Sequence, residues 1–425
     1  MHIFTDNPIR FPEEDQFGFV PYAQILRDAI WHAEPLPLCV GIFGSWGSGK
    51  SSFMQMLQKL LERPQIRTLW FNPWKYDKKE DLWSALIQTI LHSIADAKDI
   101  GEEVKETTKK LARATAWLML KKAVSTASAG LISEEHLEKM TEWFSDKDQT
   151  HYREINHFEE DFAEAVKKYT HGGKLVIFID DLDRCLPENA ITVLESLKLF
   201  IGHAQCIFVL GMDHHVVEEG IKVRFGEKKI TLSGREYLDK IIQIPFFLPP
   251  VRPEKLEAVF NVENQAFSKE IWNIIQLGMD GNPRKVKRFV NSFSLLERFV
   301  NTSAQTQPLY LRSGQPLTLK PFEQSIYLAK LLVFQISFPA FHQHLQHVGD
   351  AWAYLEEQVI EGQQPVKPEL KEFWENLAFQ RFMRQTAHSS YLNYPKAPGA
   401  DIVVSLLQAT SLVTPTPENN SPSAR

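Results

Sequence analysis

The chain has 425 residues, of which 44% are hydrophobic and 24% charged, as in ordinary soluble proteins of two or three domains. Its net charge of −6 argues against a general nucleic-acid coat, and its three widely spaced cysteines exclude a disulfide framework. The first fifteen residues, MHIFTDNPIRFPEED, are too polar and acidic for a signal or transit peptide, so we expect a cytoplasmic protein.

Apolar runs and helical patterns alternate along the first 250 residues. Short apolar runs predict five strands, at residues 38–43, 66–71, 174–180, 206–210 and 244–247. Amphipathic or apolar-periodic segments predict the helices between them, at residues 17–33, 53–61, 81–97, 154–169 and 187–201. Such alternation predicts a doubly wound, mainly parallel α/β sheet.

Residues 100–150 have weak periodicity and a biased charge, and we interpret them as a long helical insert. Residues 111–132 are the closest approach to a membrane segment, but Arg113, Lys121 and Lys122 interrupt them, so we expect no transmembrane segment. The charged runs favour solvated faces, with a partner, lipid-headgroup or nucleic-acid contact as the alternative.

No strand pattern recurs after Pro250. We therefore predict three parts: an α/β core over residues 1–250, a helical C-terminal or lid domain over 251–395, and a terminal helix with a disordered tail over 396–425. The tail, TSLVTPTPENNSPSAR, is polar and rich in proline, which is typical of disorder.

Residues 41–52, GIFGSWGSGKSS, join the first predicted strand to a predicted helix and contain the pattern G-x-x-x-x-G-K-[ST]. Amide groups of such a loop converge on a triphosphate at a helix N-terminus. Lys50 would reach the outer phosphates, and the Ser51 hydroxyl would bind Mg²⁺. The predicted nucleotide-binding residues are Gly44, Ser45, Trp46, Gly47, Ser48, Gly49, Lys50, Ser51 and Ser52.

Asp180 and Asp181 follow an apolar strand, and open α/β sheets bind ligands at this carboxyl edge. We assign Asp180 to Mg²⁺, together with Ser51, and Asp181 to the general base that accepts a proton from the attacking water. A hydrolase needs this second carboxylate, whereas a small-molecule kinase takes its nucleophile from its substrate. The sequence contains no N-K-x-D tetrad, the motif that selects guanine, so ATP is the expected nucleotide.

Basic residues elsewhere are candidates for contacting the phosphates. Arg284 begins a predicted helix and is our choice for a catalytic lid residue, with a solvated basic face or a nucleic-acid contact as alternatives. Arg184, Arg235 and Lys240 are candidates for reaching a neighbouring subunit's nucleotide.

Two further features leave alternatives open. Asp213, after the fourth strand, is either a γ-phosphate sensor or a helix N-cap. For Trp74, Tyr76 and Trp83, core packing against the sheet is favoured over ligand binding.

The motifs together resemble the KAP family of P-loop NTPases, within the water-activating (ASCE) division that includes AAA+ and STAND proteins. The matching residues are collinear over about 6–300: GSWGSGKS (44–51), FNPWKY (71–76), DDLDR (180–184), YLDKIIQIPF (237–246) and GNPR (281–284). The resemblance implies a five-stranded P-loop NTPase sheet, with ATP and Mg²⁺ as ligands. Many members carry transmembrane helices where this chain has its charged insert, and prokaryotic members often occur in phage- or plasmid-conflict systems.

We therefore predict a Mg²⁺-dependent ATPase that acts as a conformational or assembly switch in anti-phage defence. Homo-oligomerisation or a co-encoded protein partner would transmit the nucleotide state. The alternatives are an ATP-binding scaffold with little turnover and a kinase for a small acceptor.

Overall fold

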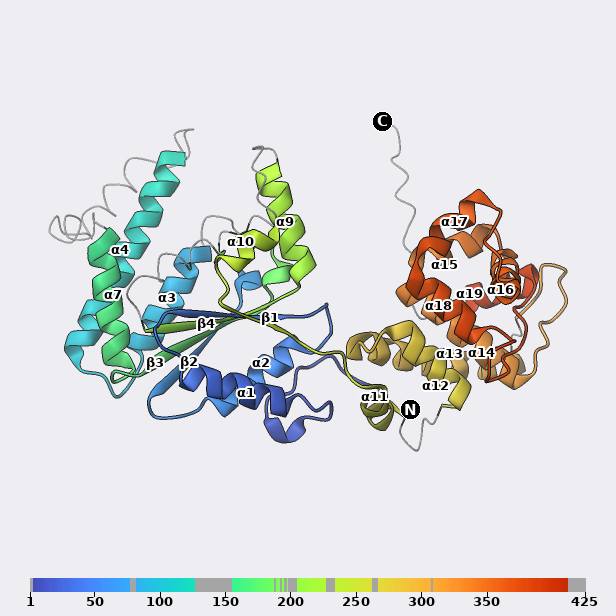
Figure 1. Ribbon diagram of the computed structural model, residues 1–425, viewed down its shortest axis with the longest axis horizontal. Helices are drawn as coiled ribbons and strands as arrows, with labels where there is room; N and C mark the ends of the chain where they lie inside the picture. Colours follow the sequence, from blue (N-terminus) through green and yellow to red (C-terminus); the bar gives the residue numbers. More distant parts are fainter. Residues whose placement is uncertain are drawn as a thin grey trace. The chain divides into compact units, whose positions relative to one another are not determined.

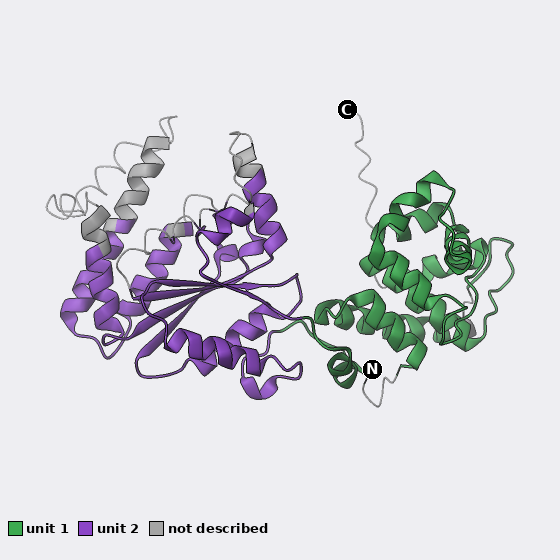
Figure 2. Cartoon of the chain, in the orientation of Figure 1, with its two compact units in different colours: residues 1–7, 250–425 green, residues 8–249 purple. Residues whose placement is uncertain are grey.

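The computed structural model describes residues 3–76, 82–126, 155–186, 189–191, 193–194, 197, 205–226, 234–261, 267–306 and 309–411. The chain forms two compact units, which Figure 2 distinguishes by colour. One unit contains Pro8–Pro249, and the other contains Met1–Asn7 and Pro250–Arg425. Each unit is described by itself below, as the nucleotide unit and the helical unit.

The nucleotide unit is built on a five-stranded parallel sheet of order β2-β3-β4-β1-β5. The strands are β1 (Leu38–Phe43), β2 (Ile66–Phe71), β3 (Lys174–Ile179), β4 (Cys206–Met212) and β5 (Ile244–Phe247). All five strands lie where the apolar runs predict them, and the predicted fold class is confirmed. The central strands read as continuous apolar runs because both of their faces are buried.

Strand β4 lies between β1 and β3, as expected for a water-activating P-loop NTPase. The register pairs Phe43 with Met212 and Ile179 with Leu210. The carboxyl ends of these three strands therefore meet at one edge of the sheet. The residues that follow them, Gly44, Asp180 and Asp213, are brought together there although they are far apart in sequence.

Helices cover both faces of this sheet, as Figure 1 shows, with α1 and α2 on one face and the other helices on the opposite face. Their bounds are α1 (Val20–Trp31), α2 (Lys50–Leu60), α3 (Leu82–Ala95), α4 (Glu102–Thr126), α7 (Ile155–Tyr169), α9 (His214–Gly226) and α10 (Gly234–Asp239). Helix α4 forms the described part of the predicted insert, whereas most of the helix predicted at 187–201 falls outside the described residues. Across the described residues, no helix combines the length and apolar character needed to cross a membrane.

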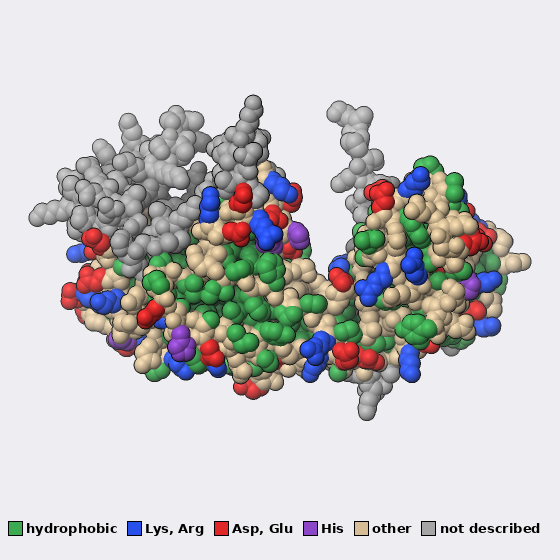
Figure 3. Space-filling model, viewed as in Figure 1, with side chains coloured by type: hydrophobic (Ala, Val, Ile, Leu, Met, Phe, Trp, Pro, Cys, Tyr) green, Lys and Arg blue, Asp and Glu red, His purple; other side chains and the backbone are tan. Residues whose placement is uncertain are grey.

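The helical unit contains no strand longer than an isolated bridge among its described residues. Its helices are α11 (Pro253–Phe260), α12 (Lys269–Met279), α13 (Pro283–Thr306), α14 (Pro321–Ser337), α15 (Pro339–His347), α16 (Ala351–Glu361), α17 (Pro368–Glu375), α18 (Leu377–Thr386) and α19 (Ala400–Thr410). Helix α14 is central, since every residue from Ile326 to Phe334 is buried. The predicted disordered tail lies outside the described residues. On the face drawn in Figure 3, acidic and basic side chains are interspersed over each unit rather than separated by sign.

The N-terminal segment packs along the polar face of α13. The Asn291 side chain accepts a hydrogen bond from the Phe4 amide at 2.9 Å and donates one to the Phe4 carbonyl at 2.8 Å. Lys287 donates to the Thr5 carbonyl at 2.9 Å, and the Arg284 Nε atom lies 3.2 Å from Asp6. These contacts explain why residues 1–7 belong to the helical unit.

Candidate functional site

The loop between β1 and α2 is shaped by its glycines. Gly47 and Gly49 have φ angles of +83° and +104°, a region that L-residues rarely adopt. A Cβ atom on Gly44 would lie 2.6 Å from the Ser48 Oγ atom. Helix α2 begins at Lys50, so its first backbone amides lack carbonyl partners within the helix and point into the loop. The loop therefore has the backbone of an anion site at a helix N-terminus.

Lys50 is buried at the end of this loop. Its Nζ atom donates to the carbonyls of Gly44 at 2.8 Å and Ser45 at 3.3 Å, and it lies 3.2 Å from the Asp183 Oδ2 atom. Three oxygens thus surround the three donors of the ammonium group. Two of these oxygens belong to neutral carbonyls. Phosphate oxygens can therefore replace them while the Lys50 ammonium stays paired with the Asp183 carboxylate.

Ser51 and Asp180 form the second part of the site. The Ser51 hydroxyl hydrogen-bonds to Asp180, and burial raises the pKa of that carboxyl to about 6 despite this bond and the nearby Lys50 ammonium. Gly211 in β4 leaves room for the carboxylate, since a Cβ atom there would lie 2.9 Å from Asp180 Oδ1. A hydroxyl and a buried carboxylate are the hard oxygen ligands that Mg²⁺ prefers.

A buried hydroxyl in the loop also fits a bound phosphate. Among the described residues, nothing lies within hydrogen-bonding reach of the Ser48 Oγ atom, although it is buried. Buried polar atoms are normally paired, so such an atom in an anion-binding loop fits a ligand oxygen. The Ser52 hydroxyl instead accepts a hydrogen bond from the Ile9 amide at 3.3 Å.

Both carboxylate oxygens of Asp181 are occupied. The Asn72 amide donates to Oδ2 at 2.8 Å, and the Arg184 Nε atom lies 2.7 Å from Oδ1. Asp181 has a left-handed backbone with a φ of +60°, which aspartate tolerates better than most residues. The general base predicted from the sequence is therefore held by one hydrogen bond, from the residue after β2, and by one ion pair, from the end of the turn η3 (Leu182–Arg184).

Arg184 also lies beside two exposed indole rings. Its guanidinium is 5.9 Å from the ring centroid of Trp46 and 5.3 Å from that of Trp74, side chains that are 59% and 53% exposed. The prediction that Trp74 packs in the core is wrong, because it is exposed, whereas Tyr76 stacks on Phe71 of β2 at 5.5 Å although it is 39% exposed. The reason is the short turn η2 (Pro73–Lys75), which leads the chain away from the sheet after Asn72 caps the Trp74 amide at 3.1 Å. The surroundings of Trp83 lie outside the described residues.

Asp183 joins the loop to strand β4. Besides its ion pair with Lys50, it accepts a hydrogen bond from the Asp213 amide at 3.0 Å. Asp213 caps α9, because its Oδ1 atom accepts from the His215 amide at 3.1 Å, which is the N-cap alternative. The roles of Asn72 and Asp183 are not predicted from the sequence. Their positions at strand ends beside the two acids are the signal that could have found them.

The remaining basic candidates lie apart from these contacts. Arg284 is in the helical unit and pairs with Asp6. Arg235 and Lys240 are exposed, on α10 and directly after it. Arg235 lines a cavity of about 460 Å³ together with Gly44, Ser45 and Asp213. A role for any of these side chains at a nucleotide, in cis or in trans, stays a prediction.

Comparison with known proteins gives a family match. The profile of the KAP family P-loop domain matches residues 19–300, more than half of the chain. An uncharacterized protein of Methanocaldococcus jannaschii is 27% identical over 171 residues, 33% of this chain and 88% of that protein. The phage T7 exclusion protein of Escherichia coli is 24% identical over 285 residues, 61% of this chain and 37% of that protein.

Solved structures give matches of low similarity. The Cdc6p structure from Pyrobaculum aerophilum has 11% sequence identity and a TM-score of 0.36, with 94% of this chain and 86% of that chain covered. The Aeropyrum pernix ORC2 structure has 11% identity and a TM-score of 0.33, with 93% and 85% covered.

Proposed function

Since the chain belongs to the KAP family of P-loop NTPases, we propose that it is a Mg²⁺-dependent ATPase whose turnover drives a conformational or assembly switch. One observation carries the proposal. The loop lysine and two aspartates are joined in a single set of contacts at the carboxyl edge of the sheet, from Lys50 through Asp183 to Asp213 at the end of β4. This is the arrangement that phosphoryl transfer to water requires.

ATP binding rearranges the partners of Lys50. The triphosphate lies along the loop amides of Gly44–Ser51, and the Lys50 ammonium moves from the Gly44 and Ser45 carbonyls to its outer phosphate oxygens. Asp183 keeps the ammonium oriented during this exchange because it is an anion that stays within reach at 3.2 Å. The loop thus binds the substrate and positions its γ-phosphate.

Ser51 and Asp180 are the residues that would hold Mg²⁺. The ion supplies positive charge against the phosphate oxygens in the transition state. Asp180 would contribute as an ionised ligand from a buried position at the end of β3.

Asp181 accepts the proton of the attacking water. The water oxygen forms a bond to the γ-phosphorus while the bond from that phosphorus to the bridging oxygen of ADP breaks, and the proton passes to the carboxylate. Each oxygen of Asp181 keeps a second lone pair for that proton, although Asn72 and Arg184 hold the carboxylate in place. Loosening either contact would let the carboxylate approach the water more freely.

Two lines support a biological setting in anti-phage defence. A relative matched over 61% of this chain is named as a phage exclusion protein, and the family resemblance points to conflict systems. We place the protein in the prokaryotic cytoplasm, with a second copy or a co-encoded protein as the partner that reads the nucleotide state. Arg284, in the helical unit, is our candidate for coupling that unit to the phosphates.

The alternative is an ATP-binding scaffold with little turnover, and the contacts that hold Asp181 in place favour it. Titration calorimetry with ATP and Mg²⁺, combined with phosphate release, separates the two functions. An ATPase loses binding in Lys50→Ala and loses turnover alone in Asp181→Asn. A scaffold binds ATP without releasing phosphate in any variant. Phosphate released without an acceptor argues against the kinase alternative.

A further inference from the structure

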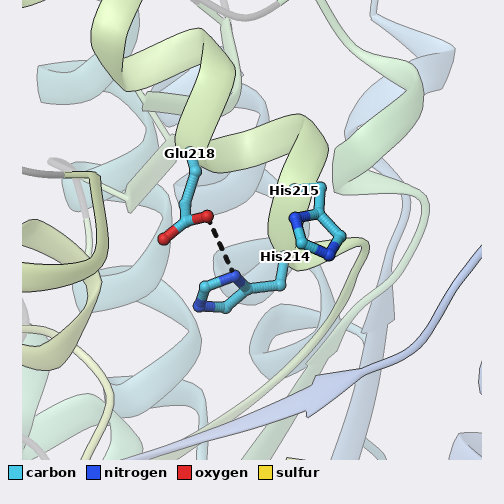
Figure 4. Close-up of side chains that lie close together, drawn as sticks. All are labelled: His214, His215 and Glu218. Atoms are coloured by element: carbon cyan, nitrogen blue, oxygen red, sulfur yellow. Dashed lines mark ion pairs between the residues drawn. The ribbon is translucent and has the colours of Figure 1, made fainter. Parts of the chain in front are cut away.

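Two histidines and a glutamate lie together on α9, and none of the three is assigned to the nucleotide. The possible ligand atoms of His214, His215 and Glu218 all lie within 4.8 Å of one another. Figure 4 shows the three side chains on the first turns of the helix, with His214 and Glu218 pointing toward each other. Residues four apart share a helix face, which explains why this pair converges.

The spacing of the pair suits a shared metal ion. His214 Nδ1 and Glu218 Oε2 are 3.3 Å apart, longer than the ~2.7–2.9 Å of a strong charge-assisted hydrogen bond. Zinc binds imidazole nitrogen and carboxylate oxygen at about 2.0–2.2 Å, so two ligands of a tetrahedral ion lie about 3.3 Å apart. The two side chains are about four-fifths buried, at 20% and 21% exposure, whereas His215 is exposed and can rotate toward them.

Packing fixes the ring of His214. Its centroid is 5.1 Å from that of Phe43 in an edge-on arrangement and 5.9 Å from that of Phe247. A ligand held by aromatic neighbours loses less side-chain freedom on binding a metal, and this favours a defined site over a chance encounter of surface groups.

The charges around the cluster favour a dication. His214 and His215 line the 460 Å³ cavity, and Asp213, Asp239 and Arg235 face the same space. With both imidazoles neutral, these three residues and Glu218 sum to two negative charges. The partial positive charge at the start of α9 opposes a cation, but it amounts to only about half a unit.

We propose that His214, His215 and Glu218 form a binding site for a zinc-type divalent ion, with the fourth coordination position open to the cavity. Two imidazoles and one carboxylate with an open position are a ligand set found in zinc enzymes. The imidazoles distinguish this site from the oxygen-only site of Ser51 and Asp180, which suits Mg²⁺. Gly44 and Ser45 line the same cavity, so the ion would lie beside the phosphate loop.

The test uses the full chain after removal of metal by a chelator. Zn²⁺ is titrated by calorimetry in buffer containing Mg²⁺, and Co²⁺ is added as a spectroscopic probe of tetrahedral geometry. We expect one saturable equivalent. His215→Gln and Glu218→Gln should each weaken it by at least about a hundredfold, because even outer partners of a metal site contribute about 10- to 100-fold.

His171→Gln is the matched control. His171 pairs with Asp99 at 3.1 Å on the surface, and it belongs to no group of three possible ligands among the described residues. If His214→Gln fails to fold because its ring packs on Phe43, the exposed His215→Gln still provides the answer. The proposal is overturned by the lack of a saturable equivalent in the wild-type chain, by unchanged binding in His215→Gln and Glu218→Gln, or by an equal loss in His171→Gln.

Discussion

Replacing Arg184 by alanine is expected to raise the ATP turnover of the isolated chain. The Arg184 Nε atom lies 2.7 Å from Asp181 Oδ1, and both side chains are mostly buried. The contact is an ion pair without hydrogen-bond geometry, and such a pair contributes up to about 1 kcal/mol, where 1.4 kcal/mol corresponds to about a factor of ten. The base is therefore released up to about fivefold more often in Arg184→Ala, and basal turnover should rise by up to that factor.

The assay is steady-state phosphate release at saturating ATP and Mg²⁺. Arg184→Lys keeps the positive charge beside Asp181 and should show a smaller increase, because an ammonium group lacks the planar donors of the guanidinium. Arg312→Ala, at an exposed site in the helical unit, controls for the loss of one positive charge. The reasoning fails if Arg184→Ala turns over more slowly than the wild type with unchanged ATP affinity. Arg184 would then stabilise the transition state rather than restrain the base.

Three further changes have defined outcomes. Asp181→Asn should lower phosphate release by about 10²- to 10⁴-fold, while calorimetry finds ATP affinity retained. Lys330 and Glu356 form a buried pair at 3.3 Å, so Lys330→Met or Glu356→Gln should each cost about 3–5 kcal/mol in urea unfolding, and the double variant should recover most of it. Burial lowers the pKa of His342 from 6.5 to about 4. Protonating the buried ring is therefore costly, and up to about 3 kcal/mol of stability is lost as the pH falls from 6.5 toward 4. Unfolding measured against pH should show this loss, and His342→Leu should abolish it.

The parallel sheet could be predicted because each of its central strands is recognisable from its own few residues. Strands buried on both faces must be apolar throughout, so β1, β3 and β4 are visible as runs without alternation. The phosphate loop is equally visible, since only glycine suits the backbone at Gly47 and Gly49, and Lys50 and Ser51 have fixed places at the start of α2.

The partners of the catalytic groups could not be predicted in the same way. The bond from Asn72 to Asp181 joins residues 109 positions apart and exists only because β2 and β3 are neighbours in register. The exposure of Trp74 depends on the turn after β2, and the pattern of hydrophobic residues in the sequence does not predict the direction of that turn. The hydrogen bond from the Phe4 amide to Asn291 joins residues 287 positions apart, and no local sequence pattern predicts it.

The contacts of Asp183 give the proposed switch a physical starting point. One carboxylate oxygen, Oδ2, contacts both the Lys50 ammonium and the Asp213 amide, at 3.2 and 3.0 Å. When phosphate oxygens replace the Gly44 and Ser45 carbonyls around Lys50, its ammonium shares its charge with them and compensates Asp183 less, and the bond of Asp183 to the Asp213 amide would strengthen or the carboxylate would move. Asp213 caps α9, so either response acts on the start of that helix. Under the proposed function, Asp183 would carry the effect of a nucleotide in the loop to the end of β4.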